Sequence, residues 1–116
     1  MRCYMLVDVH CHLDHTRFDK DRDHVIERAK KAGLKAILTC GIDRSTNRKT
    51  LEIAEKYDIV RPCLGIYPMD QLRKEVAEGL GHLEHEDFIV EQEIAFIEKN
   101  KDRLAAVAEI GLDYSE

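Results

Sequence analysis

The chain has 116 residues, enough for one domain, and its 44% hydrophobic and 35% charged residues are the balance of a globular protein with a buried core. The formal net charge of −5 excludes a protein that holds nucleic acid through a broad basic surface, because that mode depends on many Lys and Arg contacts to phosphate. No apolar run reaches the ~20 residues that span a bilayer, and residues 1–9 lack the features of a signal peptide, so we expect a cytoplasmic protein without a membrane segment.

The first part of the chain alternates between apolar runs and helical patterns. Residues 3–9 predict a buried strand, and residues 21–32 predict a helix that ends before Gly33, which stands where a C-cap glycine belongs. Residues 36–40 predict a second strand. A second helix is expected to start with Ser45 as its N-cap and to include Tyr57.

The third apolar run, residues 59–64, predicts a strand that contains Pro62. Proline cannot donate to the ladder of a sheet and is unusual in a central strand. We therefore expect an irregularity or a short pairing at this position.

The last part of the chain predicts two more helices and a fourth strand. The helical patterns cover residues 70–83 and 87–99, the second with Ile94 and Ile97 on one apolar stripe, and both should lie outside the sheet. Residues 104–110 are small and branched apolar residues with one acidic exception, which predicts the fourth strand.

Strands and helices thus alternate along the whole chain. Strands that consist of continuous apolar runs are typical of a parallel sheet covered on its faces, so the predicted fold class is α/β. No repeat or linker divides the sequence, and we expect residues 1–116 to belong to one domain.

The cysteines form no C-x-x-C pair, which predicts reduced, buried thiols instead of disulfides or a thiolate zinc site. They are Cys3, Cys11, Cys40 and Cys63.

Two histidines follow the first strand in the segment Asp8-Val9-His10-Cys11-His12. Two-residue spacing on an extended chain puts both imidazoles on one face, with Cα atoms ~6 to 7 Å apart, so both rings can reach one metal ion. A ligating imidazole needs an acceptor that fixes its tautomer, and Asp8 is the candidate. The alternative is a strand that holds two histidines for packing.

An acidic residue, Glu109, interrupts the apolar fourth strand just before Gly111. Burial of an unpaired carboxylate is unfavourable, so its presence predicts a compensating cation or hydrogen-bond network. The alternative is that the strand has already reached solvent at this point. The C-terminal end of a strand is where the active sites of (β/α) barrels assemble, and His10 and His12 belong to the same end. The three side chains can therefore meet.

Other polar residues are weaker candidates for a functional site. The basic cluster of Arg44, Arg48 and Lys49 offers local phosphate recognition or, as we favour, a solvated helix face. The remaining histidines are expected in loops or on helix surfaces, away from strand ends. They are His15, His24, His82 and His85.

Three segments together resemble successive signatures of the TatD family of metal-dependent deoxyribonucleases, in the family's order. They are Val7-Asp8-Val9-His10-Cys11-His12-Leu13-Asp14, Gly65-Ile66-Tyr67-Pro68 and Ala108-Glu109-Ile110-Gly111-Leu112-Asp113-Tyr114. The last is the most specific, because D-x-H-x-H is shared with amidohydrolases and with phosphoesterases of the polymerase-and-histidinol-phosphatase type. The resemblance implies the N-terminal half of a (β/α)8 TIM barrel, with four parallel strands and outer helices.

The resemblance also implies a mechanism. His10 and His12 match the histidines that bind one metal, and Glu109 matches the carboxylate that bridges to a second. The implied cofactors are two divalent metal ions (Zn, Mg or Mn) that activate water for phosphodiester hydrolysis, with DNA 3′ ends as the substrate. Asp8, Tyr67 and Asp113 then lie around the metals or at the substrate.

Two departures from the family pattern stand out. Tyr67 and Met69 replace the two histidines of G-x-H-P-H. A phenol donates one hydrogen bond but carries no charge near pH 7, so Tyr67 either contacts the substrate phosphate or packs against its neighbours. The later metal ligands of the family have no counterpart, because the chain stops after the fourth strand whereas a barrel takes ~250 residues. We therefore expect a missing C-terminal half or a second half-barrel, from the same or another chain. A non-catalytic scaffold and the other phosphoesterase type are the alternative functions.

Overall fold

A computed structural model describes residues 4–68, 73, 77–79 and 87–114. The expected helix over residues 70–83 therefore lies mostly outside the described residues. Nine elements follow one another in the described ranges: β1 (Leu6–Cys11), η1 (Thr16–Phe18), α1 (Arg22–Lys31), β2 (Leu34–Cys40), α2 (Arg44–Lys56), β3 (Val60–Ile66), α4 (Val90–Lys99), η2 (Lys101–Arg103) and β4 (Ala106–Ile110).

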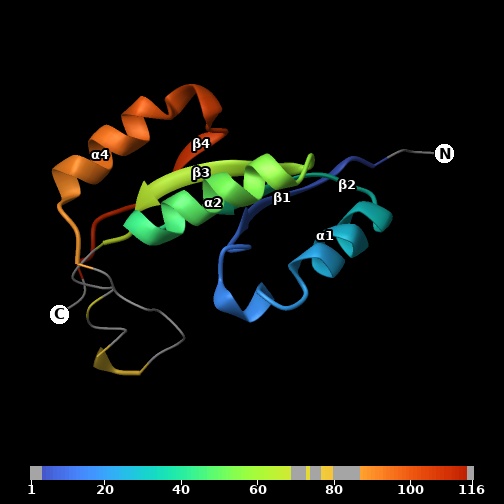
Figure 1. Cartoon of the computed structure of the whole chain (residues 1–116), viewed down its shortest axis with the longest axis horizontal. Coiled ribbons are helices and arrows are strands. Elements are labelled where there is room, and N and C mark those ends of the chain that lie inside the picture. The colour runs from blue at the N-terminus through green and yellow to red at the C-terminus, as the bar shows by residue number, and fades with distance from the viewer. Residues whose placement is uncertain (1–3, 69–72, 74–76, 80–86, 115–116) are drawn as a thin grey trace.

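The four strands form one parallel sheet in the order β1-β2-β3-β4. Helix α1 packs against β2, α2 packs against β2 and β3, and α4 packs against β3 (Figure 1). This confirms the α/β class and the four parallel strands. The parallel arrangement matters for function because it brings the C-terminal ends of all four strands to one edge of the sheet. None of the helices in the described ranges is long and apolar enough to cross a bilayer.

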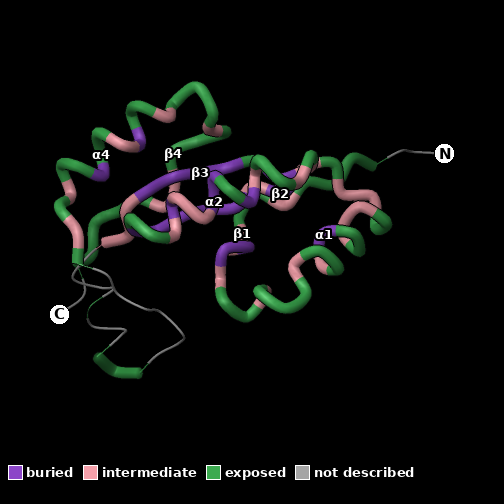
Figure 2. Tube along the Cα trace, viewed as in Figure 1, coloured by how far each residue is buried: buried purple, intermediate pink, exposed green. Residues whose placement is uncertain are grey.

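The core lies between the helices and the middle of the sheet, where β3 is buried along most of its length (Figure 2). Two clusters of buried apolar residues make up this core. The first consists of Leu13, Ile26, Ile37, Ile53 and Val60, and the second of Leu51, Leu64 and Ile97. The outer strands are different, because both carry exposed large apolar side chains. These are Leu6, Val7 and Val9 in β1 and Val107 and Ile110 in β4.

The N-cap of α2 is Asp43, so the expectation of Ser45 is wrong. The Asp43 carboxylate accepts a hydrogen bond from the backbone N–H of Thr46 at 2.8 Å, and the Thr46 hydroxyl accepts from the backbone N–H of Asp43 at 3.0 Å. This reciprocal capping box satisfies two N–H groups that the first turn would otherwise leave free. Ser45 lies inside the first turn and donates its hydroxyl to Asp43.

Pro62 lies within β3 in regular register with Thr39 of β2, so the expected irregularity does not occur there. Its carbonyl accepts from the backbone N–H of Ala105 at 2.8 Å. The N–H and C=O of a strand residue point to the same side, so the donor that proline lacks would face the beginning of β4. The ladder with β4 starts only at Cys63, and the missing donor breaks no strand pairing.

Only half of the expected stripe on α4 is buried. Ile97 is buried, whereas the side chain of Ile94 is 53% exposed. The other buried position of this helix is Glu93, one turn before Ile97. The charged residue Glu93 thus takes the buried position that the apolar pattern predicted for Ile94.

We expect Asp43→Ala to lower the free energy of unfolding by about 0.5–2 kcal/mol, because it removes the N-cap of α2. Ser45→Ala is the matched control, and we expect it to change the free energy by less than about 0.5 kcal/mol. Urea denaturation followed by far-UV circular dichroism measures both. An equal loss in the two variants would contradict the assignment of the cap.

Candidate metal centre

The segment of β1 that carries His10 contains one more residue than the strand beside it. Asp8 pairs with Ile37 of β2 and Cys11 pairs with Thr39, so three steps along β1 match two along β2. An extra residue in one strand interrupts the ladder and turns a side chain in a new direction. His10 lies within this irregular segment.

The same irregularity occurs in β4, around Glu109. Leu64 of β3 pairs with Val107, whereas Ile66 pairs with Ile110, so two steps along β3 match three along β4. The predicted ligands on both outer strands therefore lie where the local chain departs from a regular ladder. Such departures are common beside active sites, where they aim a side chain at the reacting groups.

Hydrogen bonds to Asp8 and Cys40 hold the two histidines. One carboxylate oxygen of Asp8 accepts from the backbone N–H of His10 at 3.0 Å, so Asp8 holds the irregular backbone of this segment. The imidazole of His12 instead uses Nδ1 to donate to the carbonyl oxygen of Cys40, at the end of β2, over 2.8 Å. A carbonyl only accepts, so neutral His12 carries its proton on Nδ1 and keeps the lone pair of Nε2 available. For His12, the acceptor that we assigned to Asp8 is thus the Cys40 carbonyl.

The side chains of His10, His12 and Glu109 converge at the C-terminal ends of β1 and β4. His10 Nε2 lies 3.4 Å from one carboxylate oxygen of Glu109, and His12 Nε2 lies 3.4 Å from the other. One ligand atom from each residue falls within 4.8 Å of the others, and the two imidazole centroids are 5.2 Å apart. Two neutral imidazoles and a carboxylate form a donor set that zinc and related divalent ions accept. The residues present therefore fit a metal ion.

Tyr67 and Asp113, which we assigned to the surroundings of the metals, line an open pocket with His10 and Glu109. The backbone N–H of Tyr67 donates to the carbonyl of Ile42 at 2.9 Å, which fixes the chain after β3. Four of the six predicted site residues thus border one pocket. Such a pocket can admit a substrate beside the three converging side chains.

Gly65 of β3 makes a close backbone contact with Glu109. A Cβ built on Gly65 would collide with the backbone carbon of Ala108 and with the backbone N and O of Glu109. No other residue type fits here without moving one of the two strands. The glycine therefore determines how near the peptide of Glu109 comes to β3.

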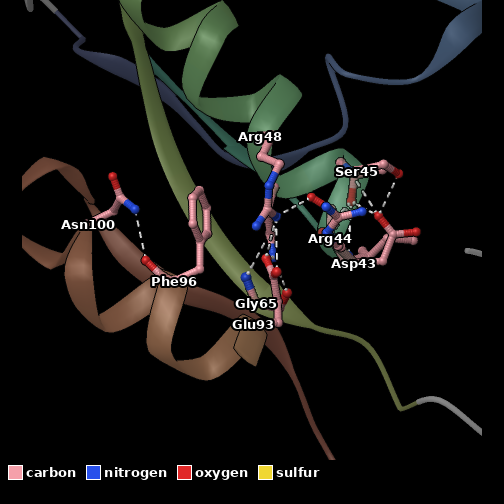
Figure 3. A network of polar contacts seen from close by, with 11 residues as sticks. Asp43, Arg44, Ser45, Arg48, Gly65, Glu93, Phe96 and Asn100 are labelled. Atoms are coloured by element: carbon pink, nitrogen blue, oxygen red, sulfur yellow. Dashed lines mark hydrogen bonds and ion pairs between the residues drawn. The ribbon is translucent and has the colours of Figure 1, made fainter. Parts of the chain in front are cut away.

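A buried polar network lies on the helix side of Gly65. The Asn47 side chain of α2 donates to the Gly65 carbonyl at 2.9 Å and accepts from the Gly65 N–H at 3.2 Å. It also donates to Glu93 of α4 at 2.9 Å, and Arg48 donates to both Glu93 oxygens at 3.0 and 3.1 Å (Figure 3). We did not predict Asn47 or Glu93 from the sequence. The signal for Asn47 was its place one turn before Leu51 on the apolar stripe of α2.

The basic cluster is largely committed to partners within the chain. The Arg48 guanidinium pairs with Glu93 and lies 3.8 Å from the centre of the Phe96 ring. Lys49 donates to Asp19 at 2.8 Å, and its hydrogen bond, with that of Arg22, lowers the pKa of Asp19 to about 2. These pairs favour a structural role over phosphate recognition.

The thiols of the described cysteines are free, and their burial disfavours the thiolate. Burial raises the pKa of Cys11 to about 11 and that of Cys40 to about 12, and it also raises the pKa of Cys63. Metals bind the thiolate, so these groups are poor ligands near neutral pH. Cys3 lies outside the described residues.

The histidines that we did not assign to the site are as expected where the structure describes them. His15 caps η1 by accepting from the backbone N–H of Arg17, and His24 is exposed on α1. His82 and His85 lie outside the described residues.

Comparisons with known proteins point to one family. The family model described as TatD related DNase matches residues 7–116. The human protein named Deoxyribonuclease TATDN3 is 37% identical over 111 residues, and the match covers 95% of this chain and 39% of that protein. A Bacillus subtilis protein named Uncharacterized metal-dependent hydrolase YabD is 34% identical, with 95% of this chain and 38% of that protein covered. The chain thus spans about two fifths of the length of these relatives.

A solved structure has the same arrangement of strands and helices. The crystal structure of YJJV, a TatD homologue from Escherichia coli, matches with a TM-score of 0.72 and 30% identity, over 96% of this chain and 39% of that one. The likeness confirms the predicted fold class, four parallel strands in a half-barrel with helices.

We expect Gly65→Ala to lower the free energy of unfolding by about 1–3 kcal/mol, because the added methyl group forces β3 and β4 apart. Gly111→Ala is the control, since a Cβ there meets only Pro68, at 3.9 Å. Chemical denaturation measures both variants. If Gly65→Ala were as stable as the control, β3 and β4 would not be in the close contact described above.

Proposed function

The chain belongs to the TatD family of DNases, and we propose that it supplies His10, His12 and Glu109 to the active site of a metal-dependent phosphodiesterase. The observation that carries the proposal is the convergence of these three side chains, with one ligand atom of each within 4.8 Å of the others. Relatives with names such as metal-dependent hydrolase support a metal-dependent reaction. In this proposal residues 1–116 are the N-terminal part of a single hydrolase domain.

Two divalent metal ions, from Zn, Mg or Mn, are the cofactors of the proposed reaction. His10 and His12 would bind the first ion through Nε2, and Glu109 would bridge it to the second. Bound metal would supply an activated water near neutral pH and stabilise the charge that grows on the phosphoryl oxygens. The His12 tautomer supports this assignment, because its Nδ1 proton is held by the Cys40 carbonyl and its Nε2 lone pair faces Glu109.

Other residues of this chain would bind and orient the substrate. The Tyr67 phenol can donate one hydrogen bond to a phosphate oxygen without adding charge, and it lines the same pocket as His10 and Glu109. Asp113 borders that pocket and is assigned to the metals or to the substrate. Asp8 holds the backbone of His10, in the irregular segment from which the His10 side chain projects.

DNA with a free 3′ end is the proposed substrate. Human TATDN3 is named a deoxyribonuclease, and a Pectobacterium carotovorum relative, 29% identical, is named a 3'-5' ssDNA/RNA exonuclease. With a net charge of −5, the chain would hold phosphate locally, through bound metal, instead of through a broad basic surface. The free cysteines of the described residues fit the reducing cytoplasm, where we place the protein.

A second half-barrel completes the site in this proposal. The candidate ligands lie on the outer strands β1 and β4 or directly after β1. The same strands have exposed apolar side chains, which are Leu6, Val9, Val107 and Ile110. Unpaired outer strands with apolar side chains favour association with further strands. These strands would come from further polypeptide of the same protein, from another chain or from a second copy related by twofold symmetry.

The metal assignment predicts that the chain binds Zn²⁺ in isothermal titration calorimetry at neutral pH. We expect His10→Ala, His12→Ala and Glu109→Ala each to raise the Kd at least ~10-fold, because each removes a ligand. His24→Ala is the matched control, because His24 is exposed on α1. Equal binding by the wild type and all variants would refute the metal site and favour a scaffold.

The substrate assignment predicts Mg²⁺- or Mn²⁺-dependent release of nucleotides from 3′-ended single-stranded DNA, reduced at least ~100-fold in Glu109→Ala. DNA with a blocked 3′ end and p-nitrophenyl phosphate are the comparison substrates. Preference for the small monoester would favour the polymerase-and-histidinol-phosphatase type.

The two-copy barrel predicts the mass of a dimer in light scattering. A monomer mass at micromolar concentration would exclude the two-copy barrel.

A further inference from the structure

We infer that Asn47 and Glu93 are positioning residues for Glu109. They act through the backbone of Gly65, and the inference rests on the proposed function only in taking Glu109 as a metal ligand. Neither residue borders the pocket, and neither belongs to the three segments on which the family resemblance was based. Their effect on the metal would be indirect, through the chain that they hold.

The Asn47 side chain replaces a missing strand partner. On either side of Gly65 the chain is held by backbone hydrogen bonds, since Cys63 accepts from the N–H of Gly41 at 3.0 Å and Tyr67 donates to Ile42 at 2.9 Å. Gly65 lies between them, beyond the point where β2 has ended. The Asn47 amide supplies both a donor and an acceptor to its backbone, as a neighbouring strand would.

Because Gly41 has no side chain, α2 can come near enough for Asn47 to make these two hydrogen bonds. A Cβ on Gly41 would lie 2.8 Å from Asn47 Cα and 2.9 Å from Asn47 N, closer than real Cβ contacts. The Asn47 side chain is fully buried, so its hydrogen bonds do not compete with water. The position of Gly65 is therefore tied to the first turn of α2.

Glu93 determines which way the Asn47 amide points. The Glu93 carboxylate only accepts, so the NH₂ group of Asn47 must face it, and the same group reaches the Gly65 carbonyl. The Asn47 oxygen is then directed to the Gly65 N–H. Glu93 is 2% exposed, and its charge is compensated by Arg48, whose guanidinium also lies over the Phe96 ring.

The line of contacts ends at the candidate ligand. Gly65 is in backbone contact with the peptide of Glu109, in the segment where β4 has its extra residue. A shift of Gly65 must therefore move the Glu109 carboxylate, which now lies 3.4 Å from the Nε2 atoms of both His10 and His12. Partners that are hydrogen-bonded to a metal ligand typically change metal affinity 10–100-fold when they are removed, and we expect the same range for partners that act through one backbone contact.

The test compares metal binding and the metal-free geometry in folded variants. We expect Asn47→Ala to raise the Kd for Zn²⁺ about 10–100-fold in calorimetry, and to weaken the nuclear Overhauser effects between the Glu109 methylenes and the rings of His10 and His12 in the metal-free chain. Asn47→Asp fills the same space and keeps the acceptor for Gly65 N–H, and it is made together with Glu93→Gln so that two buried carboxylates do not meet. It tests the loss of the donor to the Gly65 carbonyl if Asn47→Ala does not fold.

Two controls separate positioning from stability. Ile53→Val removes one methyl group from the other core cluster and should lower stability while leaving Zn²⁺ affinity and the Overhauser effects unchanged. Glu93→Gln keeps an acceptor for Asn47 and should bind Zn²⁺ more tightly than Glu93→Leu, which has none.

The outcomes distinguish this inference from the proposed function. Suppose that the wild type binds Zn²⁺ and that His10→Ala does not, but that Asn47→Ala and Asn47→Asp have a Kd within twofold of the wild type. The positioning role is then overturned and the metal site stands. If the wild type does not bind Zn²⁺, the metal site falls, and the Overhauser effects alone decide the inference. Unchanged effects in both Asn47 variants would then overturn it.

Discussion

The backbone contact between Gly65 of β3 and Glu109 of β4 is the constraint on which the candidate site depends. It places a carboxylate at the edge of the sheet, opposite two histidines at the C-terminal end of the other outer strand. Because β1 and β4 are separated by β2 and β3, the three side chains meet only if the sheet curves. Curvature of this kind is the geometry of a half-barrel, in which strand ends face a common mouth.

Two carboxylates near Gly65, those of Glu93 and Glu109, have different surroundings and therefore different roles. Glu93 is buried, and hydrogen bonds from Asn47 and Arg48 satisfy its oxygens. Glu109 is 27% exposed, and its nearest imidazole nitrogens are 3.4 Å away, beyond the usual length of a strong hydrogen bond. The first carboxylate holds helix α4 to helix α2, whereas the second retains the capacity to bind a cation. The candidate cation site of this acidic chain therefore lies at Glu109, at one edge of the sheet.

Much of the fold could be predicted because local patterns determine it. Continuous apolar runs predicted four strands, and their parallel order follows from the helices between them. The two-residue spacing of His10 and His12 and the isolated acid at Glu109 predicted residues that could meet at strand ends, and the structure brings these side chains together. Their role as metal ligands stays a prediction. The cap of α2 was misassigned because Asp43 and Ser45 are both good caps, and only the backbone geometry decides between them.

By itself, the sequence determined the strands, their parallel order and the candidate ligands, because each depends on residue type and spacing along a short segment. Only the tertiary structure decided that Asn47 and Glu93 are buried polar partners, that Cys40 orients His12, and that Gly65 touches the peptide of Glu109. The physical reason is that these contacts join residues 28 to 46 positions apart. A polar residue on an apolar stripe or a glycine in a strand has no assigned partner until helices and strands have packed.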